Sequence, residues 1–549
     1  MWYICLIKKG YIGECFMKKL NRSLVIALSV LIMAGSICQT APAQASTTDL
    51  FKQADVVTDP SKAGALWTAT FSDPYFMGTS MTSTPVVTDT CVYVVNKDSL
   101  YELDKKTGKT LRELGLPVRM NSVCDPALLN GRLYIPLSDG IIICVDTTDM
   151  QILWTSENMS QKYGMDFQTL GRLRLYDGYL YAGTWCRAVD KRVNIDHEIA
   201  SDGVFFCIDT KDGHTVWTYR NAENPVGFYW TESVMTHGRL FFNSEDGTLI
   251  SHSPAEDVVY EKVSLTDGLM LRNGLCMSND GTCLFTVSKA GVLIKITLDT
   301  DGSIKAVDKA PLITGDAVDV NCTSTPTYFD GTLYTGCAVD GCGYMCVTDA
   351  ATLKLRYAAQ GKPSGEIKSH PLVINDDIRH IYFTANENTG SLYHMTDTPA
   401  ATSGMIETVF TPYSAKQYCL ADVAIDDEGI LYYSNDSGTL FAIGETDKSA
   451  DIPDTIKVDK PYDVKIKPIK KGWKLTWKKK QTKARTEIFI RKNNKWKLYK
   501  DTKKCKEMIT YKSIKNNNNT LQIKLRCYVK QSGNKYYSKY LKISAAWGR

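Results

Sequence analysis

The sequence predicts an all-β protein: an eight-bladed β-propeller followed by a C-terminal β-sandwich. A unit of regular length recurs through most of the chain, and the composition changes abruptly near residue 451. The chain of 549 residues is too long for one ordinary core. No extended helical stripe runs through it. We therefore expect two folded units, both built from strands.

The recurring unit is an apolar residue followed by Tyr or Phe, placed between turn residues. Eight such pairs occur, namely Val92-Tyr93, Leu133-Tyr134, Leu180-Tyr181, Leu240-Phe241, Leu284-Phe285, Leu333-Tyr334, Ile381-Tyr382 and Leu431-Tyr432. Their spacings of 41, 47, 60, 44, 49, 48 and 50 residues match the length of a four-stranded propeller blade. Eight pairs predict eight blades.

Turn residues divide each unit into strands. One set precedes the aromatic strand, as in Asn130-Gly131, Asp177-Gly178, Asp280-Gly281 and Asp330-Gly331. A second set follows it, as in Asp139-Gly140, Asp202-Gly203, Asp246-Gly247 and Ser437-Gly438, and a third includes Thr107-Gly108 and Asp212-Gly213. Such dipeptides favour tight hairpins because they tolerate positive φ. Three hairpins join four antiparallel strands.

The ring closure is also visible in the sequence. The last strands of two repeats contain Leu153-Trp154-Thr155 and Val216-Trp217-Thr218, whereas the eighth repeat stops near Gly444 without such a strand. Leu66-Trp67-Thr68 has the same pattern ahead of the first full repeat. We expect it to supply the outer strand of the last blade and to leave no open edge there.

The N-terminus has the pattern of a secretory signal peptide. Lys18, Lys19 and Arg22 precede an apolar run over residues 24–33, and Ala43-Gln44-Ala45 offers a cleavage site. We assign residues 1–45 to this signal, with Met17 as an alternative start, and residues 46–64 to a lead-in. A lipid anchor at Cys38 is disfavoured, because the preceding residue is a bulky isoleucine. No later apolar run reaches about 18 residues, so no transmembrane segment is expected.

The chain holds 17 cysteines, yet their placement argues against a disulfide framework. Cys144, Cys207 and Cys346 stand at similar places in three repeats, which separate blades keep apart. We expect most cysteines to be buried thiols. Bridges between Cys342 and Cys346, or Cys276 and Cys283, stay open.

Several segments resemble pyrroloquinoline-quinone-like propeller repeats. They are LYELDKKTGKTL, FFCIDTKDGHTVW and the strand starts Ser83-Thr84-Pro85 and Ser324-Thr325-Pro326, and the resemblance covers roughly residues 65 to 445. It implies one of two branches: the quinone-dependent alcohol dehydrogenases, or the binding propellers similar to the outer-membrane-assembly lipoprotein. The dehydrogenases hold their quinone between a tryptophan and a disulfide of two consecutive cysteines, beside a calcium ion. This sequence has no Cys-Cys pair, which favours the non-enzymatic branch and predicts no cofactor.

Other catalytic signatures are missing as well. The sequence contains no GxSxG, HExxH or GxxxxGK[ST] motif. Asp196-His197-Glu198 is interpreted as a solvated loop, with metal binding as the alternative. Asp299, Asp301 and Gly302 lack the ligand spacing of a calcium loop and are interpreted as a hairpin turn. We predict no catalytic, cofactor-binding or metal-binding residues.

Ligands of propellers usually dock at the mouth of the central channel, on loops that lead into the innermost strands. In this chain those loops carry aromatic and charged residues that suit a peptide, protein or glycan ligand. The candidate ligand-binding residues are Arg119, Asp166, Phe167, Tyr229, Trp230, Arg272, Asn321, Lys368 and Tyr418. Met120, Phe228 and Asp319 lie in the same loops. Packing between the blades is the alternative role for each.

The propeller is assigned to residues 65–450, a linker to 451–460 and a basic β-sandwich to 461–549. Residues 453–549 hold 29 Lys and Arg against 6 Asp and Glu, a net charge of +23. Residues 46–452 hold 31 basic against 53 acidic residues, a net charge of −22. Strand-sized alternating runs occur at residues 464–466, 473–477, 488–490, 521–527 and 536–541.

Trp477 and the segments LRCYV and YYSKYLKI resemble a divergent fibronectin type III module of the kind appended to Gram-positive surface proteins. An immunoglobulin-like relative is the alternative. In an exported protein, so many lysines favour an anionic cell-envelope polymer as partner rather than nucleic acid. A solvated cationic face without a specific ligand, or neutralisation of the acidic propeller by the tail, are the alternatives.

We therefore expect a secreted, cell-surface-associated binding or scaffold protein. Its propeller mouth recognises a ligand, and its basic domain attaches to the envelope. The alternative from another class is a pyrroloquinoline-quinone- or calcium-dependent oxidoreductase with its active residues in the mouth.

Overall fold

The computed structural model describes residues 51–53, 58–71, 82–120, 124–187, 201–314, 319–375, 378–446, 458–470, 472–492, 495–510, 520–531 and 534–546. The chain divides into two compact units, Met1–Asp447 and Lys448–Arg549. Nearly all regular structure in these residues is strand. Their one helix, α4 (Met159–Tyr163), begins at Asn158, whose side chain accepts a hydrogen bond from the Gln161 backbone N–H, and ends at Gly164. It is too short to span a membrane.

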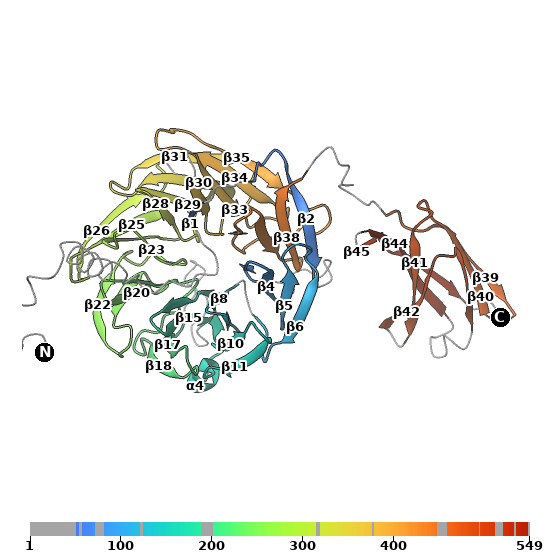
Figure 1. Ribbon diagram of the computed structural model, residues 1–549, viewed down its shortest axis with the longest axis horizontal. Helices are drawn as coiled ribbons and strands as arrows, with labels where there is room; N and C mark the ends of the chain where they lie inside the picture. The colour runs from blue at the N-terminus through green and yellow to red at the C-terminus, as the bar shows by residue number, and fades with distance from the viewer. Residues whose placement is uncertain are drawn as a thin grey trace, which may run out of the picture. The chain divides into compact units, whose positions relative to one another are not determined.

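The first unit is a β-propeller whose sheets surround a central axis (Figure 1). The described residues form eight four-stranded antiparallel sheets, here called blades 1 to 8 in chain order.

Blade 1 consists of β3 (Val86–Val87), β4 (Cys91–Asn96), β5 (Ser99–Asp104) and β6 (Thr110–Gly115). Blade 2 consists of β8 (Ala127–Leu129), β9 (Arg132–Pro136), β10 (Ile142–Asp146) and β11 (Gln151–Thr155). Blade 3 consists of β14 (Arg174–Tyr176), β15 (Tyr179–Arg187), β17 (Phe205–Asp209) and β18 (Thr215–Tyr219). Blade 4 consists of β19 (Val234–Thr236), β20 (Arg239–Asn243), β21 (Thr248–His252) and β22 (Val259–Ser264).

The remaining blades repeat this order from the axis outward. Blade 5 consists of β23 (Cys276–Met277), β24 (Cys283–Val287), β25 (Val292–Leu298) and β26 (Ile304–Pro311). Blade 6 consists of β28 (Thr327–Phe329), β29 (Thr332–Val339), β30 (Cys342–Asp349) and β31 (Leu355–Gly361). Blade 7 consists of β32 (Leu372–Asn375), β33 (Arg379–Thr384), β34 (Leu392–Asp397) and β35 (Met405–Phe410). Blade 8 consists of β36 (Ala424–Ile425), β37 (Leu431–Asn435), β38 (Thr439–Glu445) and β2 (Ala63–Thr70).

Short extra strands join some of these sheets. β1 (Phe51–Gln53) pairs in parallel with β32, and β7 (Cys124–Asp125) pairs in parallel with β13 (Gly171–Arg172). β12 (Gln168–Thr169) and β16 (Ser201–Asp202) extend β15, and β27 (Val320–Asn321) extends β29. Blades 6 and 7 also meet at their outer strands, where β31 pairs in parallel with β35.

The apolar-aromatic pairs found in the sequence all lie on the second strand of their blades. Each aromatic side chain is at most 5% exposed, so it packs between blades. Asn130 and Gly131 both have positive φ, as do Asp330 and Gly331, which is the backbone of a two-residue hairpin turn. The periodic pattern therefore marks the second strand of each sheet.

The predicted ring closure is confirmed. β2 pairs antiparallel with β38, and Trp67 stands opposite Ala442. The Trp67 indole N–H also donates a hydrogen bond of 2.9 Å to the Lys105 carbonyl of blade 1. Trp154 makes the same contact from blade 2 to the Thr210 carbonyl of blade 3, at 3.1 Å. The tryptophan in the outer strand thus fastens one blade to the next.

The structure corrects two details of the sequence analysis. Asp202-Gly203 forms no tight hairpin: Asp202 ends β16 and accepts a hydrogen bond from Arg220, so the connection from β15 to β17 is long. Cys346 is not equivalent to Cys144 and Cys207. Those two lie opposite the blade's tyrosine, whereas Cys346 lies one residue out of register, opposite Thr335. A shift of one residue turns a side chain to the other face of its sheet.

The cysteines of the described residues are free thiols, and most of them are buried. Neither Cys342 and Cys346 nor Cys276 and Cys283 are bridged. The expected signal peptide, Cys38 and Asp196-His197-Glu198 lie outside the described residues. Asp299 and Gly302 do close a hairpin turn, through a 2.9 Å hydrogen bond from the Gly302 N–H to the Asp299 carbonyl.

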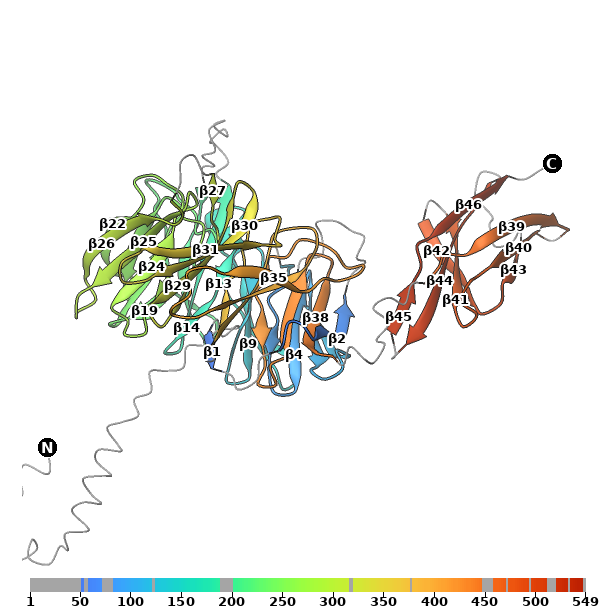
Figure 2. The same cartoon turned by 90° about the horizontal axis from the view of Figure 1, so that it is seen from above.

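The second unit is a β-sandwich of two sheets (Figure 2). One sheet contains β39 (Tyr462–Ile469), β40 (Gly472–Lys478) and β43 (Lys506–Thr510). The other contains β42 (Lys495–Thr502), β41 (Arg485–Lys492), β44 (Thr520–Gln531), β45 (Asn534–Tyr537) and β46 (Leu541–Ala546). Trp473, Trp477, Ile488 and Leu525 are among the core residues between them. The run predicted at residues 536–541 is split between the last two strands. The resemblance to a fibronectin type III module stays a prediction.

Candidate functional site

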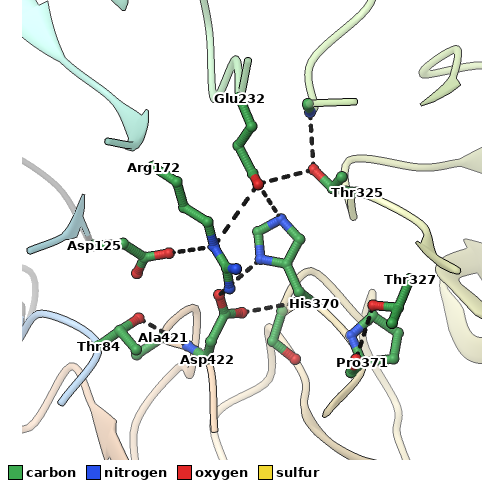
Figure 3. Close-up of polar contacts among 12 residues, drawn as sticks. Thr84, Asp125, Arg172, Glu232, Thr325, Thr327, His370, Pro371, Ala421 and Asp422 are labelled. Atoms are coloured by element: carbon green, nitrogen blue, oxygen red, sulfur yellow. Dashed lines mark hydrogen bonds and ion pairs between the residues drawn. The ribbon is translucent and has the colours of Figure 1, made fainter. Parts of the chain in front are cut away.

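One position in each blade points toward the axis of the propeller. In every blade the innermost strand begins two residues after this position, which is occupied in chain order by Thr84, Asp125, Arg172, Glu232, Gly274, Thr325, His370 and Asp422. Because equivalent positions of a propeller lie around one axis, residues far apart in sequence meet here. Figure 3 shows the polar network that joins Thr84, Asp125, Arg172, Glu232, Thr325, His370 and Asp422. We call these eight residues the axial ring.

Arg172 is the central cation of the axial ring. Its guanidinium group lies among three carboxylates, and its side chain is only 9% exposed. Its Nε lies 2.5 Å from an oxygen of Asp125 and 3.9 Å from one of Glu232, and its Nη2 forms an ion pair with Asp422 (Figure 3). Arg172 is held in place by β13, where it stands opposite Asp125 of β7.

His370 is the second cation of the axial ring. Its Nε2 lies 2.5 Å from Glu232 and its Nδ1 lies 2.7 Å from Asp422. The His370 backbone N–H donates a further 2.6 Å hydrogen bond to the other oxygen of Asp422. Both ring nitrogens therefore face carboxylates, an arrangement that suits the doubly protonated imidazolium.

The neutral members complete the connections around the ring. The Asp422 backbone N–H donates to the Thr84 hydroxyl at 3.1 Å. The Thr325 hydroxyl donates to Glu232 at 3.1 Å and accepts a 2.8 Å hydrogen bond from the Gly274 N–H. Every blade thus contributes one group to a single network.

The network shifts the pKa values of its members. Burial and Arg172 tend to lower the pKa of His370, but Asp422 and Glu232 outweigh them and raise it to about 9. Burial would raise the pKa of Asp422, yet His370 and Arg172 bring it well below its ordinary value. Asp125 is different, because burial raises its pKa to about 6 in spite of Arg172. At neutral pH, three carboxylates face two cations, and Asp125 is the least compensated.

A small cavity lies against the axial ring. Its volume is about 50 Å³, room for a few water molecules. Ring members form its floor, and Trp230, Lys368 and Thr323 also line it. The Lys368 ammonium lies 5.4 Å from the centre of the Trp230 ring and 3.3 Å from Glu366.

An aromatic cluster lies beside this cavity. Tyr229 packs edge-on against Trp185 and Trp230, with ring centres 5.1 and 4.9 Å apart. Arg272 lies 4.6 Å from the centre of the Tyr229 ring, and its Nε is 2.6 Å from Glu245. Glu245 also accepts a 2.8 Å hydrogen bond from the Trp185 indole. The three aromatic residues are half-buried, so each ring keeps an accessible part. We call Trp185, Tyr229 and Trp230 the mouth cluster.

Trp230 has an unusual backbone, with φ of 52°. A bulky residue rarely adopts the left-handed region, and such outliers gather at functional sites. Gly171 next to it has φ of 101°, and an added Cβ would lie 2.6 Å from the Thr231 carbonyl oxygen. The backbone at Gly171 therefore packs too closely against Trp230 and Thr231 to leave room for a side chain.

The structure brings five of the nine predicted ligand-binding residues together. Tyr229, Trp230 and Arg272 belong to the mouth cluster or contact it. Lys368 and Asn321 share Glu366, which accepts a 2.5 Å hydrogen bond from the Asn321 amide.

The other four predicted residues have different positions. Arg119, Asp166 and Tyr418 are exposed. Phe167 is 0% exposed and packs in the core of blades 2 and 3, which corrects its assignment to the ligand surface. Phe228 is likewise fully buried, because it packs against Phe205 at 5.5 Å.

The sequence pattern does not reveal the charged members of the axial ring. Asp125, Arg172, Glu232, His370 and Asp422 differ in chemistry, so no motif marks them. A weak signal exists: the ring position precedes proline in Thr84-Pro85, Asp125-Pro126, Thr325-Pro326 and His370-Pro371. That proline marks four of the eight ring positions.

Comparisons with known proteins agree with this architecture. The family described as outer membrane protein assembly factor BamB matches residues 53–189. Among solved structures, a quinohemoprotein alcohol dehydrogenase from Pseudomonas putida HK5 aligns over 76% of this chain and 82% of its own, with a TM-score of 0.54 and 11% identity. The corresponding enzyme from Comamonas testosteroni aligns over 76% and 82%, with a TM-score of 0.51 and 12% identity. A europium-containing methanol dehydrogenase aligns over 72% and 89%, with a TM-score of 0.52 and 12% identity.

Residues 53–189 are therefore similar to this family, whereas the solved structures share only the fold of the propeller. No curated protein sequence matches the chain. At this level of identity the structural likeness shows the fold alone, and one fold can carry both enzymes and binding proteins.

The cavity at the axial ring does not fit pyrroloquinoline quinone. The cavity of about 50 Å³ is too small for three fused rings, and no cysteine lines it. The carboxylates at its floor are already paired with Arg172 and His370. The axial ring therefore offers neither a disulfide nor carboxylates that are free to hold an ion beside a quinone.

A metal ion fits the axial ring of this propeller poorly. Asp125, His370 and Asp422 offer ligand atoms that all lie within 4.8 Å of one another. However, the Arg172 guanidinium already contacts both carboxylates, and the raised pKa of His370 leaves its ring protonated at neutral pH. A metal requires a neutral imidazole. The fixed cation Arg172 takes the place that an ion would need.

Proposed function

We propose that this chain is an exported binding or scaffold protein rather than an oxidoreductase. Its propeller recognises a partner at the mouth of the channel, and its basic second unit attaches it to an anionic polymer of the cell envelope. The observation that carries the proposal is the axial ring, whose two cations are already paired with its three carboxylates. The ring fills the channel with the protein's own charged groups, where an enzyme of this fold would need space and unpaired ligands.

The mouth cluster supports recognition of a protein or peptide. Trp185, Tyr229 and Trp230 are half-buried aromatic residues held by contacts with Arg272, Glu245 and Lys368. Aromatic and arginine side chains dominate the binding energy of protein interfaces, especially when they are held rigid before binding. A glycan is the other ligand that suits such rings, and the experiment below separates the two.

The test is a capture experiment with the full chain and envelope extracts. We expect wild-type protein to retain a partner that is lost when Tyr229 and Trp230 are both replaced by alanine. Tyr260→Ala is the matched control, since Tyr260 is 46% exposed on the outermost strand of blade 4. Protease treatment of the captured material should abolish binding of a protein partner and spare a glycan. Equal capture by wild-type and the Tyr229/Trp230 variant would contradict recognition at the mouth.

The oxidoreductase alternative makes a different prediction. Pyrroloquinoline quinone added with calcium to purified protein should give no saturable heat of binding and no quinone-dependent alcohol oxidation. Saturable binding that Asp125→Asn weakens would place the cofactor at the axial ring. The binding-protein proposal would then be wrong.

A further inference from the structure

The second unit contains a cleft lined almost entirely by cations. Its volume is about 560 Å³, within the usual range for ligand sites. Five of its lining residues are basic, namely Lys483, Arg485, Lys503, Lys530 and Lys535, and one, Asp501, is acidic. We call this the basic cleft.

The sheet order brings these cations together from four places in the sequence. Arg485 begins β41, next to β44, where it stands opposite Tyr528. Lys530 near the end of β44 stands opposite Lys535 of β45. Lys503 directly follows β42, which pairs with β41 on the other side. The cleft is therefore built at one end of the five-stranded sheet.

Internal contacts fix part of the cleft and leave the rest of its charge available. Asp501 accepts a 2.8 Å hydrogen bond from Arg485 and a 2.7 Å hydrogen bond from the Tyr528 hydroxyl. Lys535 pairs with Glu487 at 3.2 Å. Within the described residues, no carboxylate pairs with Lys483, Lys503 or Lys530, and all three are exposed.

The pairing of Lys530 with Lys535 carries a cost. Like charges directly opposite on neighbouring strands destabilise a sheet, and here both stand beside further cations. An anion in the cleft would relieve this repulsion. The geometry thus favours a ligand with several negative charges over a single carboxylate.

The lining also indicates what kind of polyanion fits. Tyr528 is its one aromatic residue. Its side chain is 2% exposed, its hydroxyl is bound to Asp501, and the Lys535 ammonium lies 4.4 Å from its ring centre. Proteins that bind single-stranded nucleic acid stack bases on aromatic rings, and this cleft presents none for that purpose. Recognition must rest on charge alone.

We propose that the basic cleft binds a linear polymer with repeating phosphate groups and no bases, of the polyol-phosphate class. This inference rests on the attachment role in the proposed function and names the site and the ligand chemistry for it. Lys483, Lys503 and Lys530 meet successive phosphates, while Asp501 holds Arg485 in position.

The experiment measures binding of medium-chain inorganic polyphosphate to the full chain by calorimetry. Lys503→Glu combined with Lys530→Glu should weaken binding by at least about tenfold, or ~1.4 kcal/mol. The matched control is Lys467→Glu combined with Lys474→Glu, because these lysines are exposed cross-strand partners on the other sheet. It should change affinity less than about twofold, and raised salt should weaken wild-type binding steeply.

The outcomes separate the cleft from the broader attachment role. If both double variants weaken polyphosphate binding equally, the basic cleft is not the binding site. Only unspecific attraction by the basic unit would then remain. Tighter binding of a single-stranded oligonucleotide than of polyphosphate with equal charge would overturn the choice of polymer. If the wild-type chain sediments with cell envelopes but does not bind polyphosphate, the proposal for the cleft is wrong and the attachment role stands. A chain that binds neither overturns the attachment role as well.

Discussion

Arg172 forms an ion pair with Asp422, which lies 250 residues later in the chain. The two residues belong to blades 3 and 8, which are not neighbours, so the pair spans the central channel. With Asp125 of blade 2 and Glu232 of blade 4, Arg172 links four of the sheets at the axis. The axial ring therefore replaces a hydrophobic core at the centre of the propeller with a network of charges.

Removing the central cation should destabilise the propeller strongly. Arg172→Met keeps much of the side-chain volume but leaves Asp125, Glu232 and Asp422 with only His370 between them. Breaking one partner out of a buried ionic network costs about 3 to 5 kcal/mol, because the remaining charges stay desolvated. Urea unfolding followed by tryptophan fluorescence would measure the loss. Arg119→Met, at an exposed position, should change stability by less than about 0.5 kcal/mol.

The stability of the propeller should fall as pH rises from neutral to alkaline. The pKa of His370 is raised to about 9 in the folded protein, against about 6.5 in an unfolded chain. The folded state holds the His370 proton more tightly than the unfolded state does. The stabilisation that His370 contributes to the free energy of unfolding is therefore complete below about pH 6.5 and is lost as pH rises through 9. The loss is on the order of 3 kcal/mol, at 1.36 kcal/mol for each unit of pKa shift.

Melting curves between pH 6 and pH 10 test this dependence. His370→Gln keeps a hydrogen-bonding side chain but does not titrate, so its stability should be lower at pH 6 and nearly flat up to pH 9. A wild-type protein whose melting temperature does not change from pH 6.5 to 9 would show that His370 is not held as a cation.

The sequence was sufficient to predict the sheets but not their meeting point. Tyr181 and Tyr432 mark their blades because every blade must bury an aromatic residue at the same place. Trp67 marked the closure because its strand had no partner nearby in sequence. These features repeat, so they can be recognised without knowing how the chain is arranged in space.

The axial ring does not repeat in that way. Asp125, Arg172 and His370 are complementary rather than alike, and their relationship exists only after the blades close into a circle. The half-buried aromatic cluster was partly predictable, because Tyr229 and Trp230 are adjacent aromatic residues in a loop, whereas its role in binding stays a prediction. Phe167 occupies the same kind of loop, yet it turns into the core between blades 2 and 3. That choice depends on packing, which the local sequence does not reveal.

Divalent cations should not stabilise the protein. Asp125, His370 and Asp422 resemble a metal site in their spacing, but Arg172 and the protonated His370 compensate the carboxylates instead. Melting temperatures at neutral pH should agree between protein with a chelator and protein with excess Ca²⁺ or Zn²⁺. An ion bound at a hundred times its Kd would add about 2.7 kcal/mol, which is readily detected. A stabilisation that Asp125→Asn abolishes would show that the ring holds a metal after all.

Gly108→Ala should weaken the closure of the propeller more than its backbone strain explains. Gly108 has φ of 64°, and a Cβ there would lie 2.3 Å from Cε3 of Trp67, the residue that fastens blade 8 to blade 1. The left-handed backbone costs about 1 to 2 kcal/mol for a residue with a side chain, and the overpacked indole adds about 1 to 3 kcal/mol.

Gly131→Ala separates these two contributions. Gly131 has φ of 73°, but a Cβ there meets only the Thr147 hydroxyl oxygen at 3.6 Å, an ordinary contact. Gly131→Ala should lower the free energy of unfolding only through the strained left-handed backbone, whereas Gly108→Ala should lower it through both the backbone and the overpacked indole. Gly108→Ala should also expose the Trp67 indole to quenching by acrylamide. If the two alanine variants unfold at the same urea concentration, the contact between Trp67 and the turn of blade 1 contributes nothing to holding the ring shut.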